Sequence, residues 1–388
     1  MSRVLVVTND FPTRRGGIES FVLALCRQLP AERVVVYTAA MPGDRAFDRT
    51  LPFTVHRDPR SVLLPTPAVR RRVTAVLRDE GCDRVVFGAS APLGLLAPAL
   101  RRAGARRIVA LSHGHEVWWA RLPVTRALLR RIGSDVDVLT YVSRWCGDRI
   151  AGALRPSARA AMRRLSPGVD PDRFRPGCGG DQVRAELGLA PDTPVVVCTA
   201  RLVRRKGQDT LVRAWSEVLR HHHGAVLLLV GEGPDRRRLE RMVRRRGLTG
   251  SVRLPGSVAW DRVPAWTDAG DVFAMPCRTR RWGLEPEAWG IVFLEAQACG
   301  LPVVVGRSGG APETLAEPDA GVVVSSAAEV AAALVELLGR GPRDRSPTAP
   351  GSAVRWTWRD AGERLAALLA GADPECPERR TDPHPGSG

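Results

Sequence analysis

The sequence lacks the cysteine spacing that marks a metal site or a disulfide framework. No two of its eight cysteines form a CxxC pair, and they are scattered over positions 26, 82, 146, 178, 198, 277, 299 and 376. Most of them lie in apolar or helical surroundings. We therefore expect free thiols in a reducing cytosol.

Long apolar runs are also missing. No stretch reaches the roughly 18 to 20 uncharged apolar residues that a bilayer-spanning helix needs. The run Val4-Leu5-Val6-Val7 is too short for the apolar part of a signal peptide, and Asn9-Asp10 ends it. A chain of 388 residues with this composition predicts a cytoplasmic globular protein of two domains, each with its own core.

Negative charge is in short supply. The chain has 58 Lys and Arg against 41 Asp and Glu, a net charge of +17, which favours an acidic partner. Nucleic acid is not expected, because zinc-finger spacing, an aromatic RNP-type strand and basic-zipper heptads are all absent. An anionic membrane surface fits better, and an arginine-rich composition with solvated faces is the alternative. The candidate membrane-contact residues are Trp118, Trp119, Arg126, Arg130 and Arg131.

The first half of the chain alternates short apolar runs with segments of helical spacing. Valine-rich runs of four or five residues are typical of strands buried on both faces of a parallel sheet. The predicted strands are Val4–Thr8, Val34–Thr38, Arg84–Phe87, Ile108–Leu111 and Val138–Val142. The predicted helices are Glu19–Leu29, Ala68–Glu80, Pro92–Ala103 and Thr125–Ile132. This repeated βα pattern predicts a doubly wound sheet.

A second set of βα units follows the proline-rich segment Ser166–Pro176, which we interpret as a linker. Its predicted strands are Val195–Thr199, Ala225–Val230, Val252–Leu254, Val272–Met275, Val303–Val305 and Gly321–Val324. The predicted helices are Thr210–Arg220, Arg236–Arg246, Asp261–Asp268, Phe293–Cys299 and Ala328–Leu338. The fold class is therefore α/β, with two Rossmann-like domains and a substrate cleft expected between them.

Loops after parallel strands carry the ligand sites in such folds. Gly16-Gly17 precedes a helix and allows a ligand to approach the backbone, although the GxGxxG fingerprint is absent. The predicted strand at 108–111 leads into Ser112-His113-Gly114-His115. Either histidine is a candidate for positioning a substrate, and a buried structural histidine is the alternative. A metal is not expected there, because no third ligand is visible nearby.

Two further loops carry charged candidates. Arg201 and Lys206 flank a turn that leads into a helix, where two cations can neutralise a diphosphate leaving group. Glu287 and Glu295 lie eight positions apart around the apolar run Ile291–Leu294, with Glu295 at an expected helix start. Such a pair suits the hydroxyls of a sugar and of a ribose. A solvated basic loop and an ordinary buried helix are the respective alternatives.

Taken in order, these motifs resemble the retaining family-four glycosyltransferases, over nearly the whole chain. The resemblance rests on Gly16-Gly17, His113, Ser166-Pro-Gly-Val-Asp170, Arg201-x4-Lys206-Gly207, Gly231-Glu-Gly-Pro and Glu287-x7-Glu295. More narrowly, Arg201–Asp209, Ser112–Val117 and Gly290–Ala298 resemble the actinobacterial phosphatidylinositol mannosyltransferases. These motifs imply two Rossmann-like domains of the GT-B type and a C-terminal helix that returns to the first domain.

The resemblance implies domains at 1–170 (acceptor side) and 171–345 (nucleotide sugar), a linker and returning helix at 346–370, and a disordered tail at 371–388. It implies α-mannose transfer from GDP-mannose to a phosphatidylinositol monomannoside at the inner membrane face. Arg201 and Lys206 would hold the diphosphate, Glu295 the ribose, and Val258 the guanine. The sugar would contact Glu287, Ile291, Val292 and His113, and Gly17 would line the donor site.

The implied mechanism is front-face substitution without an enzymatic nucleophile. The glutamate pair is not expected to act as a hydrolase acid and base, since those flank one scissile bond about 5 Å apart. No DxD appears at a strand end, so no metal cofactor is expected. A soluble acceptor and a catalytically silent basic protein on anionic membranes are the alternatives.

Overall fold

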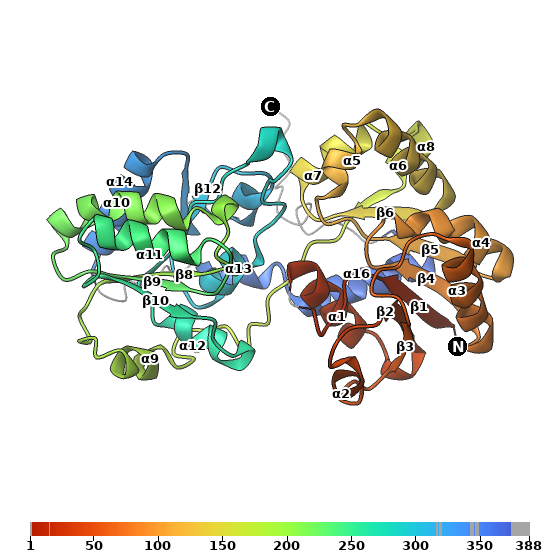
Figure 1. Ribbon diagram of the computed structural model, residues 1–388, viewed down its shortest axis with the longest axis horizontal. Helices are drawn as coiled ribbons and strands as arrows, with labels where there is room; N and C mark the ends of the chain where they lie inside the picture. Colours follow the sequence, from red (N-terminus) through yellow and green to blue (C-terminus); the bar gives the residue numbers. More distant parts are fainter. Residues whose placement is uncertain are drawn as a thin grey trace, which may run out of the picture. The chain divides into compact units, whose positions relative to one another are not determined.

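The computed structural model describes residues 2–14, 16–315, 317, 320–341, 345 and 349–373. The chain divides into two compact units (Figure 1). Unit 1 runs to Pro167 and includes the segment from Trp358 on, whereas unit 2 is Gly168–Thr357. The division falls inside the predicted linker. Most of the tail predicted to be disordered, from residue 374 on, lies outside the described residues.

Unit 1 is built on a seven-stranded parallel sheet in the order β3-β2-β1-β4-β5-β6-β7. The strands are β1 (Arg3–Thr8), β2 (Val34–Ala39), β3 (Thr54–Asp58), β4 (Cys82–Phe87), β5 (Arg107–Ala110), β6 (Val138–Tyr141) and β7 (Met162–Arg164). Five of them match the predicted strands. The sequence analysis missed β3 and β7, because β3 has only its last residue buried and β7 has only three residues.

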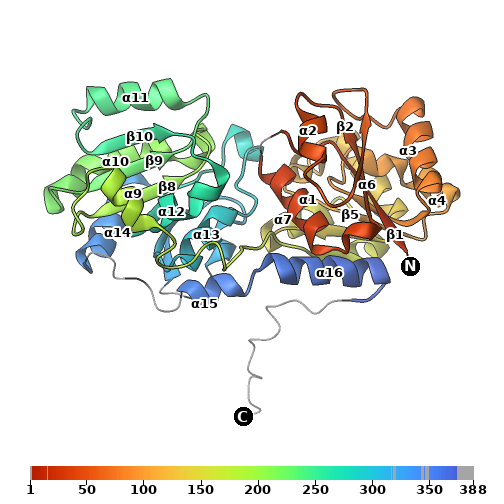
Figure 2. The same cartoon turned by 90° about the horizontal axis from the view of Figure 1, so that it is seen from below.

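The helices of unit 1 are α1 (Gly17–Gln28), α2 (Asp44–Asp48), α3 (Pro67–Asp79), α4 (Ala97–Ala103), α5 (Glu116–Trp119), α6 (Pro123–Asp135), α7 (Arg144–Ala151), α8 (Pro156–Ala160) and α16 (Trp358–Ala370). Two 3-10 turns, Ala31–Arg33 and Leu93–Leu96, accompany them. Helices α3, α4, α6 and α8 pack in succession, while α16 packs against α1 and β5 (Figure 2).

The return of the C-terminal helix to the first unit is confirmed by its contacts. A side chain at Gly362 would meet Cβ of Gln28 at 2.2 Å, so α16 approaches α1 as closely as a glycine permits. Trp358 packs against Phe21 with ring centroids 5.9 Å apart. Arg107 on β5 donates to the carbonyl of Leu368 at 2.9 Å. Helix α16 thus completes the layer that begins with α1.

Unit 2 repeats the architecture with six parallel strands in the order β10-β9-β8-β11-β12-β13. They are β8 (Val195–Thr199), β9 (Val226–Val230), β10 (Val252–Gly256), β11 (Val272–Met275), β12 (Val303–Gly306) and β13 (Gly321–Val324). All six match predicted strands. The central strands β8 and β11 are buried at every residue, as continuous apolar runs between two helical layers must be.

The helices of unit 2 are α9 (Gly180–Glu186), α10 (Gln208–His221), α11 (Arg236–Arg245), α12 (Val263–Asp268), α13 (Ile291–Ala298), α14 (Ala327–Gly339) and α15 (Ala349–Val354). Short 3-10 turns lie at Arg204–Lys206, Trp260–Arg262, Arg281–Gly283 and Ala311–Thr314. Helix α10 packs against α11 and α14 on one face of the sheet (Figure 1). Helix α12 packs against α9 and α13 on the other.

Strand order reverses direction between β1 and β4 in unit 1 and between β8 and β11 in unit 2. Loops that leave two such neighbouring strands diverge to opposite faces, and the space at their carboxyl ends is where ligands bind in doubly wound sheets. In unit 2 these are the loops 200–207 and 276–290, which contain Arg201, Lys206 and Glu287.

Candidate active site

The two loops at the switch point of unit 2 meet at Glu287. Nζ of Lys206 lies 2.7 Å from Oε2 of Glu287, and Nη1 of Arg205 lies 3.3 Å from the same oxygen. The glutamate is only 7% exposed. Burial alone would raise its pKa, but Lys206 and Arg205 hold the pKa below its ordinary value. Glu287 is therefore an ionised carboxylate in a buried setting, with two cations beside it.

A glycine allows these loops to approach. Gly207 has φ +80°, and a side chain there would meet the carbonyl oxygen of Pro276 at 1.9 Å. Next to this contact, the two loops are joined by a backbone hydrogen bond: the N–H of Arg278 donates to the carbonyl of Arg205 at 2.8 Å. Only glycine fits at position 207, because both the left-handed backbone and the close contact exclude a Cβ.

A third loop, after β12, fixes the backbone of Glu287. Its N–H donates to Oγ of Ser308 at 3.1 Å, and its carbonyl accepts from the N–H of Gly310 at 2.9 Å. The hydroxyl of Thr279 lies 2.9 Å from Oγ of Ser308. Loops after β8, β11 and β12 thus converge on one residue, which determines where its carboxylate points.

Helix α13 follows directly, after Gly290 at φ +91°. It begins at Ile291, so the expectation that Glu295 starts the helix is wrong: Glu295 lies in the second turn. The first turn belongs to Ile291 and Val292, whose backbone N–H groups precede the intrahelical ladder. The glycine in a left-handed conformation is what allows the chain to turn into the helix so early.

Glu295 differs from Glu287 although both are buried. It is 4% exposed, and burial raises its pKa to about 7, with Arg173 and Lys206 only partly opposing the rise. Near neutral pH this carboxyl group is therefore divided between its protonated and ionised forms. A ligand that donates hydrogen bonds to it favours the ionised form.

Arg201 and Val258 complete the set predicted in unit 2. Arg201 is exposed, and no side-chain hydrogen bond or ion pair of its guanidinium occurs within the described part of the chain. Its carbonyl accepts from Nε2 of Gln208 at 3.1 Å, which fixes the backbone. Val258 is half-buried in the loop after β10. Arg201 thus extends an exposed guanidinium from a fixed point of the loop.

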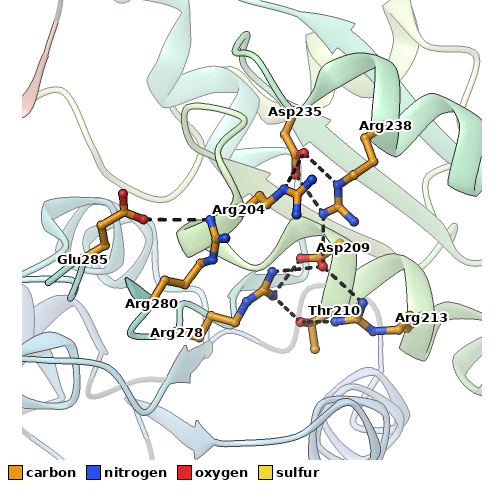
Figure 3. Close-up of polar contacts among 9 residues, drawn as sticks. All are labelled: Arg204, Asp209, Thr210, Arg213, Asp235, Arg238, Arg278, Arg280 and Glu285. Carbon is orange, nitrogen blue, oxygen red and sulfur yellow. Dashed lines mark hydrogen bonds and ion pairs between the residues drawn. The ribbon is translucent and has the colours of Figure 1, made fainter. Parts of the chain in front are cut away.

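Asp209, near the start of α10 and just after the loop 200–207, joins three segments (Figure 3). The carboxylate is 3% exposed and accepts two hydrogen bonds from Arg278, at 2.7 and 3.0 Å. Arg213 and Arg238 each lie 3.1 Å from Oδ2. Burial alone would raise the pKa of Asp209, but the surrounding guanidinium groups lower it to about 2. The carboxylate links the start of α10, helix α11 and the loop after β11.

His113 lies in unit 1, at the end of β5. Its Nε2 lies 2.5 Å from the carbonyl of Gly88, an acceptor, so Nε2 carries the proton and Nδ1 is the acceptor nitrogen of the ring. The ring packs edge-on against Phe21, with centroids 5.3 Å apart. Burial lowers the pKa of His113, so the imidazole is neutral at pH 7. In His115, by contrast, Nε2 lies 3.2 Å from Oε1 of Glu116.

The sequence analysis missed Glu116, which organises this turn. The carboxylate is fully buried and accepts from the N–H of His113 at 3.0 Å and of Gly114 at 3.2 Å. It also accepts from the hydroxyl of Ser90 at 2.9 Å. A glutamate directly after the two histidines was the only sequence signal. Gly17, the other candidate in unit 1, is the first residue of α1 and follows an extended Gly16.

The membrane-contact candidates lie on two helices rather than one. Trp118 and Trp119 are half-buried on α5, with ring centroids 5.6 Å apart. The three arginines are exposed on α6, next to the exposed apolar side chains of Leu122 (50%) and Val124 (75%). Arg126 donates to the carbonyl of Gly152 at 2.8 Å, and Arg130 to that of Ala153 at 3.1 Å. Arg131 pairs with Asp135 at 3.7 Å.

Comparison with known proteins decides the family. Residues 15–173 match the family described as Glycosyltransferase Family 4, and residues 193–340 match Glycosyl transferases group 1. A GDP-mannose-dependent alpha-(1-6)-phosphatidylinositol monomannoside mannosyltransferase of Mycolicibacterium smegmatis is 46% identical over 95% of this chain and 98% of its own length. The chain belongs to glycosyltransferase family 4. The resemblance seen in the sequence is confirmed.

A further relative agrees with family 4, and two solved structures share the fold. The counterpart in Corynebacterium glutamicum, which acts on the monoacylated monomannoside by its name, is 41% identical over 95% of this chain and 97% of its own length. The crystal structure of HepE from Anabaena with UDP has a TM-score of 0.77, at 20% identity over 95% of this chain and all of that one. Sucrose-phosphate synthase from Thermosynechococcus elongatus gives 0.75, at 20% identity over 95% and 98%. These neighbours confirm the two-domain GT-B fold.

Proposed function

We propose that this chain transfers α-mannose from GDP-mannose to phosphatidylinositol monomannoside, where it adds the second, α-1,6-linked mannose to the inositol lipid. The observation that carries the proposal is the identity of 46%, over nearly the full length of both chains, to the mycobacterial enzyme of that name. The charged residues at the switch point of unit 2 support it, because they provide what a nucleotide sugar needs. They combine cations for a diphosphate with carboxylates for hydroxyl groups.

In this proposal Lys206 and Arg201 hold the diphosphate of the donor. Lys206 lies against Glu287, so the carboxylate that accepts hydrogen bonds from the mannose hydroxyls is next to the cation that holds the phosphate. The N–H groups of Ile291 and Val292 lie at the start of α13, where a helix favours negative charge or hydroxyl oxygens. Glu295 accepts from the ribose, Val258 contacts the guanine, and Gly17 is a further donor-binding residue.

The reaction then needs no nucleophilic side chain. As the bond from mannose C1 to the diphosphate breaks, negative charge accumulates on the phosphate oxygens and positive charge on the sugar ring. Lys206 and Arg201 stabilise the negative charge on the phosphate oxygens. The ionised Glu287, which lies beside Lys206, stabilises the positive charge on the sugar ring. The acceptor hydroxyl enters on the same face, and the leaving phosphate takes its proton. His113, neutral with Nδ1 as an acceptor, orients the C6 hydroxyl of the donor sugar.

The lipid acceptor requires contact with a membrane. None of the helices within the described ranges is long and apolar enough to cross a bilayer. We propose that the enzyme binds the inner face of the plasma membrane through α6, whose arginines and exposed Leu122 and Val124 combine charge with apolar anchors. Trp118 and Trp119, the other proposed membrane contacts, lie half-buried on α5, which packs against α6.

The test is transfer of labelled mannose by the purified full-length chain. It is incubated with GDP-mannose or UDP-glucose, with and without phosphatidylinositol monomannoside, in buffer with EDTA or Mg²⁺. We expect a lipid-linked dimannoside with an α-1,6 bond from GDP-mannose only, formed equally well in EDTA. Absence of any lipid product from GDP-mannose and phosphatidylinositol monomannoside would overturn the acceptor assignment. Activity lost in EDTA and restored by Mg²⁺ would overturn the metal-free mechanism.

A further inference from the structure

Glu287 is paired with two neighbouring cations, Arg205 and Lys206, and the structure holds these two side chains differently. Both lie in the 3-10 turn at Arg204–Lys206, and both are half-buried. Nζ of Lys206 lies 2.7 Å from Oε2 of Glu287, and it has no second polar partner among the residues that the structure describes. An ammonium group has several N–H donors, so Lys206 can bind a further acceptor such as a phosphate.

Arg205 is attached to the loop of Glu287 at several points. Its Nη1 donates to Oε2 of Glu287 at 3.3 Å and to the carbonyl of the preceding residue, Pro286, at 3.2 Å. Its own carbonyl accepts from the N–H of Arg278 at 2.8 Å. The guanidinium of Arg205 is therefore held by the backbone next to Glu287 as well as by the carboxylate, whereas Lys206 contacts the carboxylate alone.

This difference becomes important when a nucleotide sugar binds, because its diphosphate competes for the cations. Lys206 is one of the two residues proposed to hold the diphosphate, so its charge is then shared between the phosphates and Glu287. A buried carboxylate without a paired cation is costly and tends to take up a proton instead. Arg205, which stays attached to the loop of Glu287, can compensate the carboxylate in the donor complex.

The charges of these groups balance only if Arg205 is counted. A diphosphate esterified at both ends carries one negative charge on each phosphate, and Glu287 adds another. Arg201, Lys206 and Arg205 supply one positive charge each. The thiol of Cys277, which interacts with Glu287, adds no charge near neutral pH, because burial raises its pKa to about 12. Without Arg205 one negative charge stays uncompensated beside the buried carboxylate.

We propose that Arg205 is a positioning residue for Glu287, which it keeps ionised and in place when the diphosphate of the donor engages Lys206. The inference rests on the donor site proposed above and adds a division of roles within it. Arg201 and Lys206 act on the phosphates. Arg205 acts on the sugar through Glu287 and contacts neither phosphate nor sugar. The two adjacent cations of this turn therefore serve the two sides of the bond that breaks.

The first test measures the affinity of the full-length chain for GDP and for GDP-mannose by calorimetry. In Arg205→Gln the affinity for GDP should stay within about a factor of three, as after a surface substitution. The affinity for GDP-mannose should fall roughly tenfold, because only the sugar uses Glu287. Lys206→Ala should weaken both ligands. The matched control Arg204→Gln removes an exposed arginine that lies 3.7 Å from Asp235, and it should weaken neither.

The second test is the pH dependence of turnover at saturating GDP-mannose. Arg205→Gln should lower kcat by up to about 10², because Glu287 is no longer held where it stabilises the sugar ring. The pKa of Glu287 should be higher in this variant, since one of the cations that lower it is gone, so the acid limb of kcat should move to higher pH. Arg205→Lys restores a cation and should recover much of the turnover. A purely structural role of Arg205 would not move the acid limb.

Three results would overturn the inference. GDP affinity that falls in parallel with turnover would mean that Arg205 binds the diphosphate itself. An unchanged kcat and acid limb in Arg205→Gln would remove the role, and so would an Arg204→Gln variant that is equally slow. The affinities need no acceptor. If the wild type binds GDP-mannose but forms no lipid product, the proposed acceptor is wrong, while a selective loss of GDP-mannose affinity in Arg205→Gln still supports the positioning role.

Discussion

The two units share one sheet architecture, but different interactions hold the loops that follow their strands. In unit 2 the loops at the switch point are joined by ion pairs, with Glu287 between Lys206 and Arg205 and Asp209 among three guanidinium groups. In unit 1 the buried Glu116 is held by two backbone N–H groups and a hydroxyl beside a neutral His113. The fold is the same, and the charges that the loops carry distinguish the two sites.

The difference fits the chemistry proposed for each side. A nucleotide diphosphate brings negative charge, and a loop whose cations are already fixed needs little rearrangement to receive it. A sugar hydroxyl is neutral and is oriented best by a fixed acceptor such as Nδ1 of His113. Removing one charge from the loops of unit 2 should therefore impair function more strongly than removing one from the surface of unit 1.

The largest effect is expected at Lys206. The Lys206→Ala variant removes the cation closest to Glu287 and, in the proposed function, a charge that stabilises the leaving diphosphate. Loss of such stabilisation costs on the order of 3 kcal/mol, or 10² to 10³ in turnover. We expect the same for Arg201→Ala. The measurement is the steady-state rate of mannose transfer at saturating donor.

The matched control for Lys206 is Arg204→Gln in the same loop. Arg204 is exposed and lies 3.7 Å from Asp235 rather than from Glu287, so its loss should leave turnover within a factor of a few. If both Lys206→Ala and Arg201→Ala keep wild-type kinetics, the donor binds elsewhere. If Arg204→Gln is as slow as they are, general loop charge rather than these positions matters.

The next effect concerns stability at Asp209. A carboxyl group whose pKa in the folded state is about 2, below its ordinary 3.8, stabilises the fold above its unfolded pKa. This contribution is lost as the pH falls from about 4 to about 2. The Asp209→Asn variant should lose about 2 kcal/mol of unfolding free energy at pH 7, as measured by urea unfolding. The difference from wild type should narrow below pH 4.

Asp192→Asn is the control for this change, since Asp192 is exposed. It should alter the unfolding free energy by less than about 0.5 kcal/mol. An Asp209→Asn variant as stable as wild type at pH 7 would mean that the arginines around the carboxylate do not stabilise the loop arrangement.

A third prediction separates the two glutamates by pH. The pKa of Glu295 is raised to about 7, so protonation of the free enzyme between pH 8 and 6 removes the carboxylate proposed to bind the ribose. We expect KM for GDP-mannose to rise about tenfold over this range, in proportion to the ionised fraction. The folded state, which holds this proton more tightly than the unfolded chain, should lose stability as the pH rises from about 4.5 to 7.

Two variants sharpen this result. Glu295→Gln should have a KM that no longer changes with pH in this range. Glu287→Gln, although slower, should keep the dependence, because the pKa of Glu287 is lowered and lies outside the range. A KM in wild type that is flat between pH 6 and 8 would argue against Glu295 as the ribose acceptor.

The sequence predicted the sheets well because their central strands are unmistakable. Val195–Thr199 and Val272–Met275 are buried at every residue and, apart from Thr199, apolar, as is typical of strands covered on both faces, and the structure confirms both ranges. The polar strand Thr54–Asp58 lies at the edge of its sheet, next to β2 alone, and gave no apolar run to detect. The start of α13 was predicted too late, at Phe293 or Glu295 rather than at Ile291, because it depends on the backbone of Gly290.

Within the site, the sequence identified residues by type and position but not their partners. Lys206 and Glu287 were both candidates, yet nothing in their spacing showed that they pair with each other. Arg205 was overlooked because only the folded loop turns it toward Glu287. Glu116 and Asp209 were overlooked for a similar reason. A single carboxylate acquires its role from N–H groups and arginines that come from distant segments.

The smallest effect is expected on the surface of unit 1. Replacing Arg126, Arg130 and Arg131 with glutamine should weaken binding to vesicles that contain anionic lipid, since each basic residue near such a surface contributes at most about 1 kcal/mol. Two of these arginines also donate to carbonyls at the end of α7, which restrains them, and salt screens all three.

The control removes three exposed arginines, Arg244, Arg245 and Arg246, from the end of α11 in unit 2. Sedimentation with vesicles at two salt concentrations should show a larger loss for the α6 variant, which should still mannosylate a short soluble acceptor analogue. Equal losses in the two variants would mean that net charge, and not α6, attracts the enzyme to the membrane.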